Sequence, residues 1–144
     1  MFSGAFRPKV DAKGRLAIPK QYRDQLDRGA VISIGPETVL TIYPKTEWDN
    51  LRDVLRSPLT ATPEQRELSR AMSALAVPCE FDAQGRVTLS HEQRRLAGIE
   101  PESTTVVIGN QTVVEIWAEA RWDSYSAGAF SNFTDNVNKV TRSI

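Results

Sequence analysis

An internal repeat constrains the fold of this chain more than any other feature of its sequence. Residues 11–16, DAKGRL, return as residues 82–87, DAQGRV, and Arg23 returns as Arg94 at the same offset of 71 positions. Six further positions recur at an offset of 74: Gly35, Thr38, Val39, Ile42, Trp48 and Asp49 are matched by Gly109, Thr112, Val113, Ile116, Trp122 and Asp123. A chain of 144 residues therefore has room for two small copies of one structural unit, joined tightly.

Each copy is predicted to combine short strands with short helices, which makes the fold class α+β. Runs of β-prone residues bounded by turn signals predict strands at residues 6–10, 16–18, 30–35 and 38–43, and at 77–81, 87–89, 104–108 and 113–117 in the second copy. The Asp-x-x-Gly turn is predicted to close the first two strands of each copy into a hairpin. Helices are predicted from Pro19, from Ser90 and around the repeated tryptophans Trp48 and Trp122.

This pattern divides the chain into four parts. We expect a first unit at residues 1–56, a helical linker at 57–75, a second unit at 76–126 and a polar tail at 127–144. Thr62, Pro63 and Gln65 provide a strong start signal for the linker helix. Phe130, Phe133, Val137 and Val140 keep helical spacing within the tail, so it is expected either to fray or to dock as a helix on a neighbouring subunit.

Composition excludes several classes of protein. Eighteen basic residues balance eighteen acidic ones, so there is no whole-molecule attraction to nucleic acid or membrane. The single cysteine, Cys79, cannot form an intramolecular disulfide, and we expect a reducing, cytoplasmic location. No apolar run approaches the roughly 18 residues that span a bilayer, so no membrane segment is predicted.

Catalytic constellations are nearly absent. His91 is the only histidine and follows Ser90 at a predicted helix start, where a solvated residue is expected, and Cys79 has no histidine nearby in the sequence. Nucleotide-binding glycine motifs and paired metal ligands do not occur. We therefore expect no enzyme, no cofactor and no metal.

The two Asp-x-x-Gly-Arg segments are the best candidates for a binding function. Each places an arginine, Arg15 or Arg86, directly after a tight turn, where its planar fork can reach phosphate or the edge of guanine. Lys13 and Gln84 would add donors at the tips. Asp11 and Asp82 either orient the arginines or only stabilise the turns, and a purely structural ion pair between Asp and Arg is the alternative reading.

Charge is distributed unevenly along the chain, which favours the binding reading. Residues 1–28 carry seven basic and three acidic residues, a local charge of +4, whereas residues 99–144 carry three basic and six acidic residues. Because salt screens charges beyond about 8 Å, a basic end of a neutral protein can still face DNA.

A further set of residues carries a family resemblance. The chain resembles the MraZ family of bacterial transcriptional regulators at several places along its length. The matching segments are Met1-Phe2 with Gly4, the two Asp-x-x-Gly-Arg segments, Leu16 to Pro19 followed by Tyr22-Arg23, the strand ends at 42–44 and 115–117, and both tryptophan helices. The likeness extends from Met1 to about Tyr125.

The resemblance implies a fold of tandem AbrB-like units, each supplying half of a swapped-hairpin β-barrel with short flanking helices. It implies a ring-shaped homo-oligomer that binds repeated sites in double-stranded DNA and represses the division and cell-wall gene cluster, including the regulator's own gene. The family's DNA-reading motif falls here on Asp11, Lys13, Gly14 and Arg15 and on Asp82, Gly85 and Arg86. This chain departs from the first copy by Gln84 in place of Lys13 and by Ser90 in place of Pro19.

The leading hypothesis is therefore a sequence-specific DNA-binding repressor, cytoplasmic and nucleoid-associated, that acts on direct repeats. The expected DNA-binding residues are Lys13, Gly14, Arg15, Gln84, Gly85 and Arg86, and the secondary candidates are Arg7 and Lys9. Two alternatives remain open: an AbrB-type antitoxin-like DNA binder with a protein partner, and a ring-forming assembly protein without a nucleic-acid role.

Overall fold

A computed structural model describes residues 1–55 and 59–142 and confirms a mixed α+β architecture with antiparallel sheets. The first unit contains β1 (Ala5–Phe6), β2 (Arg15–Ala17), α1 (Lys20–Gln25), β3 (Ala30–Ile34), the short 3-10 helix η1 (Pro36–Thr38), β4 (Leu40–Pro44) and α2 (Lys45–Leu55). The helix α3 (Pro63–Leu75) follows. The second unit contains β5 (Val77–Pro78), β6 (Arg86–Thr88), α4 (His91–Ala97), β7 (Thr105–Asn110), β8 (Val113–Ala118) and α5 (Glu119–Ser131), and α6 (Phe133–Thr141) ends the described chain.

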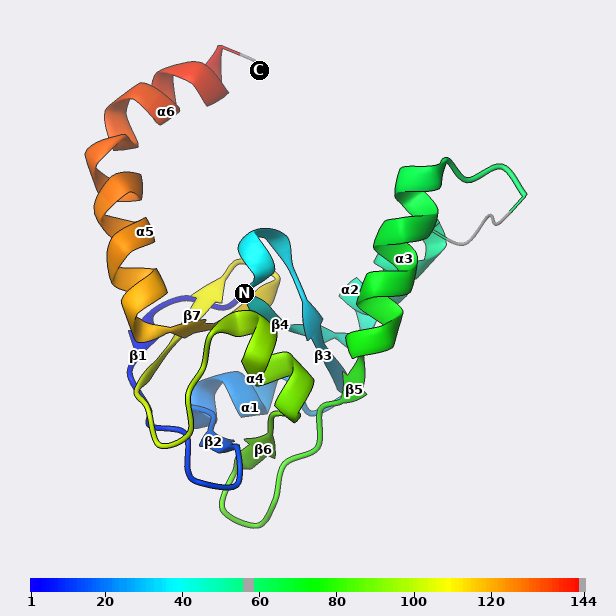
Figure 1. Cartoon of the computed structure of the whole chain (residues 1–144). Coiled ribbons are helices and arrows are strands. Elements are labelled where there is room, and N and C mark those ends of the chain that lie inside the picture. Colours follow the sequence, from blue (N-terminus) through cyan, green and yellow to red (C-terminus); the bar gives the residue numbers. More distant parts are fainter. Residues whose placement is uncertain (56–58, 143–144) are drawn as a thin grey trace.

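The two units share one six-stranded antiparallel sheet in the order β1-β7-β8-β4-β3-β5 (Figure 1). The first strand of each unit pairs with the central hairpin of the other unit: β1 with β7, and β5 with β3. A separate two-stranded ladder joins β2 to β6 below this sheet. Neither unit therefore completes its sheet alone.

The pairing has an approximate two-fold symmetry that follows from the duplication. Leu16 pairs with Val87, its own counterpart at the offset of 71. Thr41 pairs with Glu115, its counterpart at the offset of 74, where β4 meets β8. A residue that pairs with its own equivalent lies on the axis that relates the two copies, so this axis passes through both ladders.

The core lies between the large sheet, the β2–β6 ladder and the helices α1 and α4. Leu16, Val87, Tyr22, Ile42 and Ile116 are each at most 1% exposed. Leu16 and Val87 are counterparts of each other, as are Ile42 and Ile116, so the repeat preserves apolar positions in these strands. Tyr22 differs, because its counterpart is the buried polar residue Gln93. The repeated tryptophans of the helices are only half-buried: Trp48 packs against Tyr43, and Trp122 packs against Trp117.

Local helix-start signals formed as expected. The hydroxyl of Thr62 accepts from the N–H of Gln65, and the Gln65 side chain accepts from the N–H of Thr62. Ser90 and Gln93 form the same reciprocal pair before α4. Pro19 precedes α1 as its cap residue rather than occupying the first helical position.

The predicted hairpins require a correction. Each Asp-x-x-Gly turn closes, since Asp11 N–H donates to the Arg15 carbonyl at 3.0 Å and Gly14 N–H donates to the Asp11 carbonyl at 3.1 Å. However, the segments on either side of the turn do not pair with each other as a ladder; β2 pairs with β6 instead. The expected strand at 6–10 is also interrupted, because Pro8 lacks the N–H that a ladder needs and only Lys9 forms an isolated bridge, with Thr104.

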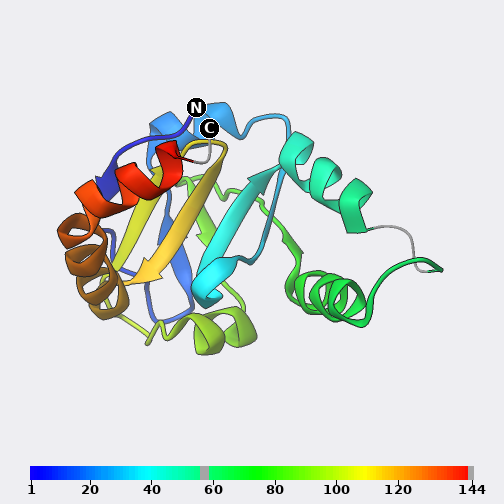
Figure 2. The ribbon, with the colours of Figure 1, turned by 90° about the horizontal axis from the view of Figure 1, so that it is seen from above.

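Helices extend from opposite sides of the sheet. Figure 2 shows α2 and α3 on one side and α5 with α6 on the other. The boundary predicted after residue 56 lies outside the described residues. Among the described residues, no helix is long and apolar enough to cross a membrane.

Candidate nucleic-acid interface

The two Asp-x-x-Gly-Arg turns have the same internal geometry. In the first turn, Oδ1 of Asp11 accepts from the N–H of Lys13 at 2.9 Å and from the N–H of Arg15 at 2.8 Å. In the second turn, Oδ1 of Asp82 accepts from the N–H of Gln84 and from the N–H of Arg86, both at 2.9 Å. One carboxylate oxygen thus fixes the backbone of each turn.

These bonds also hold the carboxylates in their charged form. The N–H of Arg15 is the main cause that lowers the pKa of the Asp11 carboxyl, and burial opposes this effect. The pKa of Asp82 is lowered in the same way, chiefly by the N–H of Arg86. Because these hydrogen bonds are stronger to the charged carboxylate than to the protonated acid, both aspartates are ionised at neutral pH.

The second carboxylate oxygen orients the arginine. Nε of Arg15 donates to Oδ2 of Asp11 at 2.7 Å, and Nε of Arg86 donates to Oδ2 of Asp82 at 2.9 Å. Both arginine side chains are partly exposed, 35% and 27% respectively. Since each aspartate engages Nε, the terminal Nη atoms of Arg15 stay unbonded within the described part of the chain. The aspartates therefore stabilise the turns and also orient the arginines.

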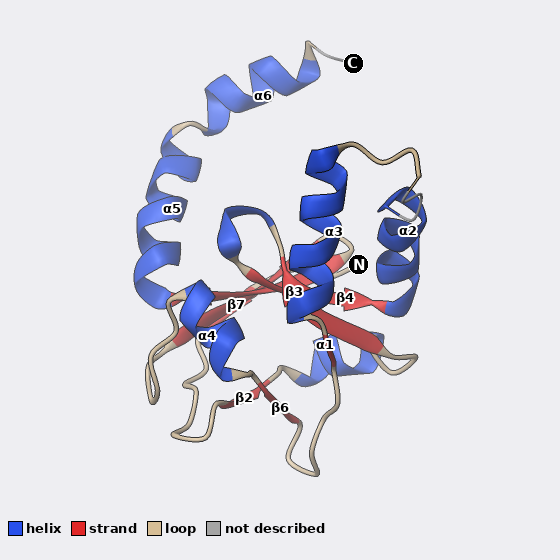
Figure 3. Ribbon diagram, turned by 45° about the vertical axis from the view of Figure 1, so that its right-hand side comes forward, coloured by secondary structure: helices blue, strands red, loops and turns tan. Residues whose placement is uncertain are grey.

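The β2–β6 ladder brings the two turns together at one end of the molecule (Figure 3). The Gly14 carbonyl accepts from the N–H of Leu89 at 2.8 Å, and the Gly85 carbonyl accepts from the N–H of Ile18 at 3.1 Å. Nη1 of Arg86 lies 3.6 Å from Oδ2 of Asp11, so charges of the two turns also meet directly. The ladder thus makes one surface from two motifs that are 71 residues apart.

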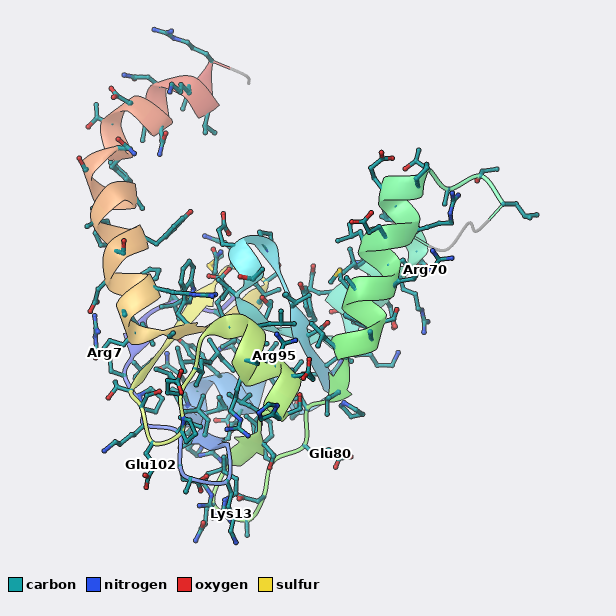
Figure 4. All side chains as sticks on the ribbon, viewed as in Figure 1. Arg7, Lys13, Arg70, Glu80, Arg95 and Glu102 are labelled. Atoms are coloured by element: carbon teal, nitrogen blue, oxygen red, sulfur yellow. The ribbon has the colours of Figure 1, made fainter. Side chains whose placement is uncertain are left out.

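Lys13 and Gln84 occupy the tips and are exposed. Figure 4 shows the Lys13 side chain at the far end of the molecule from the helical arms. Within the described residues, neither tip side chain forms a hydrogen bond or ion pair. Both remain available to a ligand.

The secondary candidates lie elsewhere. Nη1 of Arg7 donates to Glu119 at 2.9 Å, and its Nη2 donates to Asp123 at 3.1 Å, which ties β1 to the start of α5. Figure 4 places Arg7 beside α5 and well away from Lys13. Lys9 is exposed between this contact and the first turn.

Sequence reasoning missed two arginines at this end. Arg23 and Arg94 are half-buried, and their Nε atoms donate to the carbonyls of Ile18 and Leu89 at 3.0 and 3.3 Å. Their shared offset of 71 was the available signal. Among the described residues, no group of three or more His, Cys, Asp or Glu side chains could hold a metal ion.

Comparison with known proteins identifies the family. The family model described as "MraZ protein, putative antitoxin-like" matches residues 1–71 and again residues 72–143. A transcriptional regulator MraZ of Mycobacterium sp. (strain KMS) is 35% identical over 144 residues, covering 100% of this chain and 99% of the relative. A relative of the same name from Desulforamulus reducens is 36% identical, over 97% of this chain and 97% of its own length. Another from Pediococcus pentosaceus is 38% identical, over 94% of this chain and 93% of its own length.

These names agree with the expectation of a non-enzymatic protein, because they describe regulators of transcription. The two matches of the family model also correspond to the two copies of the sequence repeat. The chain belongs to the MraZ family.

Proposed function

We propose that this chain is a sequence-specific DNA-binding transcriptional repressor that contacts duplex DNA through its two Asp-x-x-Gly-Arg turns. The β2–β6 ladder carries this proposal, because it brings together, at one end of the molecule, the two turns that hold Lys13, Arg15, Gln84 and Arg86. A purely structural ion pair would not require the two turns to meet there.

The chemistry of the four side chains suits DNA. An arginine fork can donate to O6 and N7 of guanine, a glutamine can pair with the N6/N7 edge of adenine, and a lysine neutralises phosphate. The aspartates hold each arginine by Nε, which leaves the Nη pair of Arg15 free to contact a base. Gly14 and Gly85 contribute as the turn glycines, because each takes a positive φ and packs against an arginine of the other unit, which shapes the turn that carries the contacting side chains.

The fold is proposed to consist of tandem AbrB-like units, in which each copy supplies half of a swapped-hairpin barrel. The exchange of β1 and β5 between the units supports this description. We retain the division into a first unit (1–56), a helical linker (57–75), a second unit (76–126) and a tail (127–144) as part of the proposal. One chain would then present the two turns that a single-unit relative presents only as a dimer.

Several chains are proposed to act together as a ring on direct repeats of DNA. One arginine contact supplies only about 1–3 kcal/mol of discrimination, which is too little to compete with non-specific DNA. Linked sites raise avidity by about 10² to 10⁴ when their spacing matches that of the DNA. Cyclic symmetry favours direct repeats, whereas a two-fold dimer favours a palindrome.

Two apolar surfaces on opposite sides of the sheet support such self-assembly (Figure 2). On α6 and the end of α5, Phe130, Phe133 and Val140 are 71%, 64% and 62% exposed. On the other side, a groove of about 210 Å³ lies between α2 and α3, lined by Trp48, Leu51, Leu55 and Met72 among others. A helix with apolar residues three and four apart fits a groove of this kind in a second copy.

The sites are proposed to lie upstream of a division and cell-wall gene cluster that includes the regulator's own gene. The corresponding location is the cytoplasm, in association with the nucleoid. A DNase footprint on the region upstream of the gene would define the sites and their spacing.

A titration of labelled upstream DNA by fluorescence anisotropy tests the proposal. Arg15→Ala should weaken the discrete complex by roughly 5- to 150-fold per contact, from about 1–3 kcal/mol for one fork. The matched control is Arg70→Ala, an exposed arginine on α3 that lies far from the turns in Figure 4 and should leave the affinity unchanged. Equal affinities of the wild type and Arg15→Ala would refute the role of the turn.

Mass and salt dependence separate this function from its alternatives. Light scattering should show an oligomer that Phe133→Ser disrupts and that the exposed polar control Asn136→Ser preserves. The logarithm of the binding constant should fall with the logarithm of salt concentration by about 0.9 for each neutralised phosphate. Absence of DNA binding, or binding whose affinity does not depend on salt concentration, would favour the assembly protein. The words "antitoxin-like" in the family description leave a toxin-binding regulator as the remaining alternative.

A further inference from the structure

Arg23 of the first unit lies against the turn of the second unit. A Cβ atom added to Gly85 would lie only 2.6 Å from Cζ of Arg23 and 2.8 Å from its Nε and Nη1 atoms. The same Nε donates to the carbonyl of Ile18, whose own N–H donates to the Gly85 carbonyl. The flat guanidinium of Arg23 therefore supports the turn that carries Arg86.

Arg94 has the reciprocal position in the second unit. A Cβ atom on Gly14 would lie 2.9 Å from its Nε and 3.1 Å from its Cζ. Nε of Arg94 donates to the carbonyl of Leu89, and the N–H of Leu89 donates to the Gly14 carbonyl. Because Gly14 and Gly85 are separated by the same 71 positions as Arg23 and Arg94, duplication has preserved both halves of this crossed contact.

Ion pairing does not account for these two side chains. Neither arginine forms a salt bridge with a carboxylate in the described part of the chain. The neighbouring Arg95 makes the contrast plain: it is exposed and pairs with Glu92 at 2.7 Å, whereas Arg94 turns inward and is half-buried. A half-buried guanidinium held by a carbonyl and pressed against a glycine is suited to fixing the position of a backbone.

We propose that Arg23 and Arg94 are positioning residues that act across the two units. Arg23 sets the turn that presents Arg86, and Arg94 sets the turn that presents Arg15. The arginine of each unit thus controls the DNA-facing turn of the other, so the two tips keep a fixed relation to each other. The effect on DNA affinity rests on the proposed function, whereas the crossed effect on the turns can be measured without DNA.

Hydrogen exchange followed by mass spectrometry tests the crossed contact on the intact chain. Arg23→Ala should accelerate amide exchange about tenfold in the segment 82–87 and by less than twofold in the segment 11–16. Arg94→Ala should give the reverse pattern, and the control Arg95→Ala should change neither segment. Faster exchange only in the variant's own unit, an equal effect on both turns, or no effect on either would overturn the proposal.

A milder pair of variants keeps the test decisive if the alanine variants do not fold. Arg23→Lys and Arg94→Lys retain the charge but lack the flat guanidinium and its Nε donor. They should therefore show the same crossed pattern with a smaller amplitude. Exchange identical to that of the wild type in both lysine variants would refute positioning by the guanidinium plane.

DNA affinity gives a second readout that a merely structural role would not produce. In the Arg15→Ala background, Arg23→Ala should lower affinity further by about tenfold, but in the Arg86→Ala background by less than twofold. A direct contact between Arg23 and phosphate would instead lower affinity equally in both backgrounds, which would contradict the positioning role. If the wild type binds no DNA, the proposed function fails while the exchange pattern still decides the crossed contact.

Discussion

Replacing Gly14 with alanine is expected to destabilise the fold by about 2–4 kcal/mol. The backbone at Gly14 has a φ of +80°, a conformation that costs a residue with a side chain about 1–2 kcal/mol. The new methyl group would also lie 2.8 Å from the carbonyl oxygen of Leu89, which is backbone and cannot rotate away. Moving it would stretch the bond from the Leu89 N–H to the Gly14 carbonyl, at a further cost of about 1–2 kcal/mol.

Gly98 is the matched control because it shares the backbone conformation but not the close contact. Its φ is +71°, and the nearest atoms, at 3.2 Å or more, belong to the end of the flexible Arg121 side chain. Gly98→Ala should therefore cost only the conformational part, about 1–2 kcal/mol. The difference between the two variants isolates the packing of the first turn against the second unit.

Urea unfolding followed by tryptophan fluorescence measures the free energy of unfolding of both variants. All proteins are compared at the same concentration, because the apparent stability of an oligomer depends on its concentration. With a slope of about 2 kcal/mol per molar urea, Gly14→Ala should lower the unfolding midpoint by about 1–2 M, and Gly98→Ala by half as much, about 0.5–1 M. Equal destabilisation by the two variants would refute the argument, because it would mean that the turn does not need the close approach of the two units.

Three further measurements address the turns, the thiol and the linker helix. The native pKa values of Asp11 and Asp82 lie below the unfolded value near 3.8, so the two carboxylates stabilise the fold above that pH, and this contribution is lost as the pH falls through the native values. The urea midpoint of unfolding should therefore drop more between about pH 5 and pH 2 in the wild type than in Asp11→Asn. Equal drops in the two proteins would contradict this. Burial raises the pKa of the Cys79 thiol to about 12, so iodoacetamide at pH 8 should label the native protein far more slowly than the urea-unfolded protein. Similar labelling rates would contradict the burial of this side chain. Thr62→Ala removes the hydroxyl that caps α3 and should cost about 1 kcal/mol in urea unfolding, whereas the exposed control Thr46→Ala should cost less.

Local patterns in the sequence predicted the elements well but not their partners. The capping residues of α3 and α4 identify their own helix starts, because the bonds they form connect residues only three positions apart. The strands β2 and β6 are only three residues long, and such short runs carry no information about which strand lies beside them. The expected hairpin was wrong for this reason, since the pairing of β2 with β6 depends on contacts between residues far apart in the chain.

The candidate site shows the same division between local and distant contacts. The turn geometry around Asp11 and Arg15 could be predicted, because the sequence places donor and acceptor four residues apart. The contact of Arg23 with Gly85 could not, because it spans the two units and depends on the β2–β6 ladder. The repeat contained the only hint, in the equal spacing of two arginines and two glycines.

The approximate two-fold axis also determines which positions a duplicated chain can vary. Leu16 and Val87 pair with each other on the axis and are both buried, so a change in one must fit the other, and both have stayed aliphatic. Lys13 and Gln84 at the exposed tips have no such constraint, and they differ. A symmetric dimer of identical single units would present the same tip twice, whereas this chain presents a point charge on one side and an amide on the other. Under the proposed function, the two tips then recognise unequal half-sites, which gives each chain a direction along the duplex, as binding to direct repeats requires.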